Sequence, residues 1–306
     1  MRSLLISAAL LLTGNAFADL SNTQLPAGSA WYVHVALDTM RDSEAGKPLY
    51  RWLQDEVLEE ANESLEEEFD DAIDLDLDRD IERITAYGNA DGDVTAIITG
   101  NISTATRDKL MSLADEHGTL DSKRTAGKTY YHLQGMAIDE KDLQVEADEL
   151  FFSFDGSKRL ILGTHEKNLQ AAMRQSARRG NAPSAMLVLS ADRELVQGGV
   201  NTDEFGDNDS FSFNSGLLKQ TRELAFVLAD SNGDIDLQLS ITADDPEATN
   251  SLAAVVRGLI GLQALSGEGN PELRKLLNSV QVNNDSRGLT LRLVTAPDTV
   301  LRIIED

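Results

Sequence analysis

The chain has no cysteine, few histidines and, past its start, no apolar run of membrane-spanning length. Cysteine is absent from all 306 residues, which excludes disulfides, thiol nucleophiles, thiolate zinc sites, iron–sulfur clusters and covalent haem attachment. The 4 histidines include no pair with the spacing of metal ligands. A transmembrane helix needs about 20 apolar residues, and we expect no membrane span.

Basic residues are also scarce compared with acidic ones. The chain carries 52 Asp and Glu against 27 Lys and Arg, a formal net charge of −25. Such a charge repels nucleic-acid phosphates and anionic lipid headgroups, so we expect no nucleic acid among the partners. Basic peptides, cations or no partner fit the charge better.

Such an acidic composition suits a salt-rich environment, because salt screens the repulsion among the acids.

The first eighteen residues have the pattern of a secretory signal. Arg2 is followed by an apolar run, Leu4 to Leu12, and by Ala16-Phe17-Ala18, the small-x-small motif of a cleavage site. The absence of cysteine excludes a lipid anchor on a cysteine. We expect cleavage after Ala18, residues 1–18 being the signal peptide, and a periplasmic location.

Short strands and amphipathic helices alternate along the remaining chain. Asp91-Gly92 and Asn232-Gly233 each separate two strand-like runs and predict two β-hairpins. The order of elements before Asn181-Ala182-Pro183 recurs after it, which indicates a degenerate duplication. We therefore predict an α+β fold of two repeated modules, residues 19–180 and 181–306, each with an antiparallel sheet and helices packed on one face.

Two segments of the second module carry sharper expectations. In Ile235–Thr242 apolar and polar residues alternate strictly, which predicts a strand with one buried and one wet face. Leu252–Leu265 is apolar almost all round and is interrupted only by Arg257 and Gln263, which predicts a core helix. Its two glycines, at positions 258 and 261, leave open close packing against another subunit.

Acidic residues gather between Asp55 and Glu82. Oxygen-rich clusters suit calcium, but a calcium-binding loop of the EF-hand type that begins at Asp74 would meet Arg79 and Thr85 where Gly and Glu are needed. A solvated acidic face is the preferred interpretation, and cation binding by this segment stays open.

Motifs for catalysis fail on inspection. His165-Glu166 begins like a zinc-protease helix, but Leu169 stands where the second histidine belongs. Gly127-Lys128-Thr129 resembles the end of a phosphate-binding loop, but it precedes a strand. We therefore predict no catalytic residue, no cofactor and no metal ligand, although the many carboxylates leave an acid-based hydrolase possible in principle.

Five aromatic or histidine residues are the candidate interaction surface. Tyr32 and His34 share one face of a predicted strand, and Phe205, Phe211 and Phe213 lie in a long segment rich in Gly, Asn, Asp and Ser.

Several stretches resemble a family of uncharacterised secreted proteins of Gram-negative bacteria. They are residues 80–88, residues 154–163, and Asn270-Pro271-Glu272-Leu273 with Leu276-Leu277-Asn278-Ser279. The resemblance implies a secreted protein and carries no reaction, ligand or site residue.

Together these patterns favour a non-enzymatic periplasmic protein that acts by binding, its partner unknown and plausibly another envelope protein. Two alternatives stay open. One is a carboxylate-based hydrolase, with or without calcium. The other is a passive assembly protein that dimerises through the helix at 252–265.

Overall fold

The structure is a computed structural model that describes residues 29–58, 77–135, 149–174, 185–200, 220–265, 271–285 and 288–305. The strands are β1 (Trp31–Ala36), β2 (Ile81–Gly88), β3 (Val94–Gly100), β4 (Thr119–Thr125), β5 (Lys128–Gln134), β6 (Glu149–Phe154), β7 (Arg159–Gly163), β8 (Ala185–Asp192), β9 (Thr221–Ser231), β10 (Asp234–Ala243), β11 (Gln281–Asn284) and β12 (Gly288–Thr295). The helices are α3 (Leu37–Asp42), α4 (Gly46–Leu53), the π-helix η1 (Gln54–Leu58), α6 (Leu77–Asp80), α7 (Thr104–His117), α8 (Glu166–Arg174), α9 (Arg193–Val200), α11 (Pro246–Leu265), α12 (Pro271–Ser279) and α13 (Pro297–Glu305).

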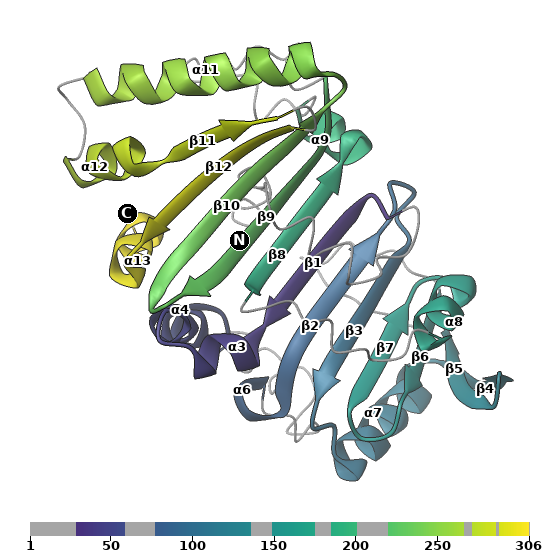
Figure 1. Cartoon of the computed structure of the whole chain (residues 1–306). Helices are drawn as coiled ribbons and strands as arrows, with labels where there is room; N and C mark the ends of the chain where they lie inside the picture. Colours follow the sequence, from purple (N-terminus) through teal and green to yellow (C-terminus); the bar gives the residue numbers. More distant parts are fainter. Residues whose placement is uncertain are drawn as a thin grey trace. The chain divides into compact units, whose positions relative to one another are not determined.

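The strands pair into sheet and are accompanied by helices, which confirms the α+β class (Figure 1). Within the first of the two units described next the strand order is β11-β12-β10-β9-β8-β1, within the second it is β2-β3-β7-β6-β5-β4, and the pairings detailed below are antiparallel. Two compact units share the chain. Of the described residues, the first unit includes residues 29–34, Thr39–Leu49 and those from 185 onward, and the second includes Val35–Asp38 and those from Tyr50 to Arg174. The modules expected at 19–180 and 181–306, and their duplication, stay predictions.

Both predicted hairpins are present. Strands β9 and β10 pair from Ser231↔Asp234 onward, with Asn232 at φ 57° and Gly233 at φ 91° in the turn. Positive φ at both central residues is the geometry that favours Asn-Gly. Strands β2 and β3 pair from Gly88↔Val94, and Gly92 has φ 92°. Because these turns depend on neighbouring residues only, they could be predicted from the sequence.

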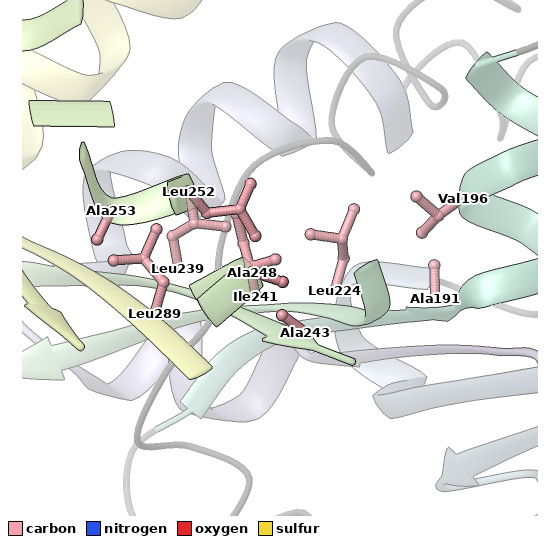
Figure 2. Close-up of a cluster of buried hydrophobic side chains, with 10 residues drawn as sticks. All are labelled: Ala191, Val196, Leu224, Leu239, Ile241, Ala243, Ala248, Leu252, Ala253 and Leu289. Atoms are coloured by element: carbon pink, nitrogen blue, oxygen red, sulfur yellow. The ribbon is translucent and has the colours of Figure 1, made fainter. Parts of the chain in front are cut away.

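In the first unit, one face of β9, β10 and β12 packs against helices. The buried cluster there consists of Ala191, Val196, Leu224, Leu239, Ile241, Ala243, Ala248, Leu252, Ala253 and Leu289. Figure 2 shows the α11 members of this cluster directed at the side chains of β10 and β12. Helix α11 therefore supplies the cover for this face of the sheet, as its apolar sequence predicts.

The wet face predicted for β10 is wrong in part. Asp234 is exposed and Gln238 half-buried, but Asp236 is only 7% exposed and Ser240 only 5% exposed. The Asp236 carboxylate accepts hydrogen bonds from Arg292 on β12, with Nη2 at 2.7 Å and Nε at 2.9 Å. A polar side chain is buried without large cost when a partner satisfies it. Strict alternation thus predicts which residues share a face of the strand, but it does not predict whether that face is exposed to solvent.

The second unit contradicts the prediction that helices pack on one face only. Helix α8 packs against Phe151 and Ile161, whereas α7 packs in a separate cluster with Phe152 and Leu160. Successive residues of a strand point to opposite faces of the sheet. The two helices therefore cover opposite faces of β6 and β7.

Two local differences from the sequence-based expectation concern strand ends and edges. Leu37 continues the apolar alternation of Trp31, Val33 and Val35 and would fit a strand, but it begins α3, and it is 2% exposed. Strand β4 is not predicted at all. It pairs with β5 through a turn at Ala126 and Gly127, and its polar, charged sequence is typical of an edge strand that avoids further pairing.

Candidate docking surface on helix α11

Helix α11 is fixed at its start and along one side. The Asp245 side chain accepts a hydrogen bond from the backbone nitrogen of Ala248 at 2.8 Å, the contact of an N-cap. Leu252 and Ala253 are completely buried against the sheet. Farther along, the Arg257 guanidinium donates to the Val282 carbonyl at 3.2 Å and to Asn284 Oδ1 at 2.8 Å, which joins the helix to β11.

From Val255 onward, α11 exposes large apolar side chains. Val255 is 37% exposed, Leu259 40% and Leu262 67%. These residues are four and three positions apart, so they form one stripe along the helix. The prediction of a core helix is therefore correct at Leu252 and Ala253 and wrong at these three residues. We call the stripe of Ser251, Ala254, Val255, Gly258, Leu259 and Leu262 the α11 stripe.

Small residues open the middle of the α11 stripe. A methyl group added at Gly258 or at the neighbouring Gly261 would meet no atom within 4 Å. Packing inside this chain thus gives no reason for glycine at either position. Each glycine in an exposed helix costs about 1 kcal/mol compared with alanine, so their presence is explained if something outside the chain approaches the backbone here.

The α11 stripe is also free of negative charge. No Asp or Glu occurs from Ala248 to Leu265, in a chain with 52 acidic residues. The single charged side chain in this stretch, Arg257, is held by β11. An acidic protein therefore presents one uncharged apolar helix face, which is the kind of surface that marks an interaction site.

The candidate residues expected from the sequence lie elsewhere. Tyr32 is 5% exposed and its ring stacks on that of His34, with centroids 6.4 Å apart. His34 is half-buried. Phe205, Phe211 and Phe213 lie outside the residues that the structure describes. The proposed role of these five residues stays a prediction. The α11 stripe was missed because its sequence is apolar on every side of the helix.

His165 belongs to a polar cluster at the β2–β3 turn. Its Nδ1 lies 2.9 Å from Asp93 Oδ1, and Asp93 Oδ2 accepts hydrogen bonds from Asn89 at 3.0 Å and Asn168 at 3.3 Å. Asn89 Oδ1 in turn accepts from the backbone nitrogens of Asp91 and Asp93. These contacts hold the hairpin turn against the start of α8, which is a structural role.

A second cluster links β4, β5 and α8. The Tyr130 hydroxyl donates to Glu166 Oε1 at 2.5 Å, and Lys123 Nζ lies 3.4 Å from Glu166 Oε2. The hydrogen bond from Tyr130 lowers the pKa of Glu166, with a further contribution from Lys123, and Glu166 raises the pKa of Tyr130. The cluster keeps Glu166 ionised and ties the edge strand to the helix.

Glu223 is the acid that comes nearest to the hydrolase alternative. Burial raises its pKa, and Asp192, its cross-strand neighbour, raises it further, while the hydrogen bond from Ser190 at 3.4 Å lowers it. The Asp192 carboxylate accepts hydrogen bonds from the backbone nitrogens of Glu194 and Leu195 at the start of α9. Asp192 therefore serves as a helix cap.

Within the described residues, no group of three or more metal-ligating side chains is arranged to hold a metal ion. In the same part of the chain, no helix is long and apolar enough to cross a membrane. Most of the acidic segment 55–82 lies outside the described residues, so its cation binding stays open.

Comparison with known proteins finds similarity of fold alone. Crystal structures of TP0453, a protein of Treponema pallidum, are similar over most of both chains. Form I has 10% identity and a TM-score of 0.39 over 90% of this chain and 93% of that one. Form III has 8% identity and a TM-score of 0.42 over 90% and 94%. No family model and no curated protein matches the sequence.

Proposed function

We propose that this chain is a non-enzymatic periplasmic interaction protein and that the α11 stripe is its docking surface. The observation that carries the proposal is the exposure of Val255, Leu259 and Leu262 on a helix that is buried against the sheet at Leu252 and Ala253. Apolar surface exposed in this way gains about 25 cal/mol for each Å² that a partner covers. The signal-like residues 1–18 support the location.

The resemblance to secreted proteins of Gram-negative bacteria belongs to the same proposal. So does the interpretation of the two units as degenerate copies of one module. Neither is needed for the docking surface, because the α11 stripe lies within one unit. The partner must present an apolar, uncharged surface, since the stripe offers no carboxylate to a basic one.

Site-specific photo-crosslinking tests the proposal. A photoreactive phenylalanine analogue replaces Leu262 in the full chain, produced in the bacterium to which it belongs. The matched control carries the same analogue at Leu195, another exposed leucine, 41% exposed, on α9. We expect a discrete adduct with a protein partner from position 262 and none from position 195. The absence of any adduct at 262, or the same adduct from both positions, would contradict the proposal.

A further inference from the structure

We infer that the partner of the α11 stripe is a second copy of this chain, with the two α11 helices antiparallel across a twofold axis. This inference rests on the proposed function, because it names the occupant of the proposed docking surface. It places the axis beside the midpoint between Val256 and Arg257. A twofold contact of this kind uses the same patch on both copies.

The order of large and small residues in the α11 stripe carries the inference. Antiparallel pairing about the midpoint sets Ser251 opposite Leu262, Ala254 opposite Leu259 and Val255 opposite Gly258. Every large side chain thus meets a small one, which lets the two helices approach closely without voids. The open space above Gly258 is where Val255 of the second copy fits.

Parallel pairing gives the reverse result. It would set Leu262 against Leu262 and Gly258 against Gly258, as parallel helices can also pack, but Val255 would then not fill the open space above Gly258. The fit of Val255 to that space is what favours the antiparallel direction. A partner of unrelated sequence would not require this match between the two halves of one helix.

Charge also favours a second copy over a basic partner. Two copies at a net charge of −25 each repel one another wherever acids meet. The stretch from Ala248 to Leu265 has no acid, so contact there avoids the repulsion. A basic partner would gain from carboxylates at the contact, and the α11 stripe has none.

Engineered cysteines test the pairing, because the chain has no cysteine of its own. In the antiparallel pair, position 251 of one copy lies level with position 262 of the other. Two copies of position 262 lie about 16 Å apart along the axis, at 1.5 Å for each residue. A disulfide needs Cα atoms within about 7 Å. The same limit prevents a disulfide between positions 251 and 262 of one chain.

We expect the double variant Ser251→Cys/Leu262→Cys to form a disulfide-linked dimer on mild oxidation of the purified chain. An equimolar mixture of the two single variants should do so too, whereas Leu262→Cys alone should stay monomeric. A monomeric double variant would overturn the inference. Efficient dimer formation by Leu262→Cys alone would overturn it as well, because it would indicate parallel pairing.

Sedimentation of the cysteine-free chain gives a second measurement. The paired stretch, Ser251 to Leu262, is short, and an interface below about 1,200 Å² is typical of weak association. The measurement therefore needs protein concentrations of about 100 μM.

Higher salt should strengthen the dimer, because it screens repulsion between the copies. We expect Leu262→Glu to weaken dimerisation at least about tenfold, since it buries an unpaired charge, and Leu195→Glu to leave it unchanged. Equal effects of both variants would overturn the inference.

The two proposals fail in different ways. If the crosslinked adduct at position 262 contains another protein and the purified chain stays monomeric, the docking surface stands and self-pairing is overturned. If no adduct forms and no disulfide dimer appears, both are overturned. Thermal unfolding of each variant checks that it folds, and the pattern among the cysteine variants does not depend on any loss of stability.

Discussion

Glu223 shows how a single carboxyl group links burial to pH. It lies on β9, where burial raises its pKa, and Asp192 across the strand raises it further. Ser190 donates one hydrogen bond that lowers it. In the unfolded chain the pKa returns to the ordinary value for glutamate, about 4.3. The folded state therefore holds its proton to a higher pH than the unfolded state does.

This difference predicts the effect of Glu223→Gln on stability. As the pH rises from about 4 through the raised folded pKa, the unfolded state ionises first, so the free energy of unfolding of the wild type falls. Glutamine cannot ionise and removes that loss. We expect the variant to have the higher Tm at pH 7 to 8, with the difference shrinking toward pH 4.

Thermal unfolding between pH 4 and pH 8 measures this. Glu194→Gln, at an exposed position on the neighbouring helix α9, is the control and should follow the wild-type curve. A Glu223→Gln variant that is less stable than the wild type at pH 8 would contradict the view that ionisation of Glu223 destabilises the folded state.

At the scale of the element, α11 has a covered part and an exposed part that its apolar sequence does not distinguish. Leu252 is completely buried against the sheet, whereas Leu262 is 67% exposed. Both are leucines of one helix, in similar apolar surroundings along the chain. Hydrophobic periodicity identifies an exposed part of a helix only where polar residues mark it, and from Leu252 to Leu265 only Arg257 and Gln263 are polar.

Alanine at the two positions should therefore have very different effects. We expect Leu252→Ala to lower the free energy of unfolding by about 2–5 kcal/mol, because it leaves a cavity in the core. Leu262→Ala should change it by less than about 0.5 kcal/mol, as is usual at the surface. Urea unfolding at low protein concentration, where the chain is monomeric, measures both, and similar losses would show that the outer face is packed.

At the scale of the whole molecule, the net charge of −25 opposes the compact state. Folding brings the acids closer together than in the unfolded chain. Asp38 with Arg83 and Asp236 with Arg292 are two pairs that offset part of the repulsion. The range of the remaining repulsion is the screening length, which depends on the salt concentration.

We therefore expect the Tm to rise steadily with salt. The screening length falls from about 30 Å at 0.01 M to about 3 Å at 1 M, which removes most of the repulsion between separate acids. Sodium and potassium chloride should give equal increases, because screening depends on ionic strength. A Tm that is flat or falls over this range would contradict the view that self-repulsion limits stability.

The sequence by itself determined the features that neighbouring residues specify. Asp91-Gly92 and Asn232-Gly233 fixed the two hairpins through backbone conformations that few other residues adopt. Ser103 similarly caps α7 by accepting a hydrogen bond from the Thr106 nitrogen at 3.0 Å. Such signals act over a few residues, so the pattern of strands and helices could be predicted closely.

Only the tertiary structure decided which surfaces are covered. Asp236 is buried because Arg292, far along the chain, lies beside it. Helices α7 and α8 take opposite faces of the same strands, and β4 is a strand because β5 pairs with it. The α11 stripe is exposed because the sheet covers only part of its helix, around Leu252 and Ala253. Burial depends on residues distant in sequence, and the local patterns that specify turns and helices carry no record of them.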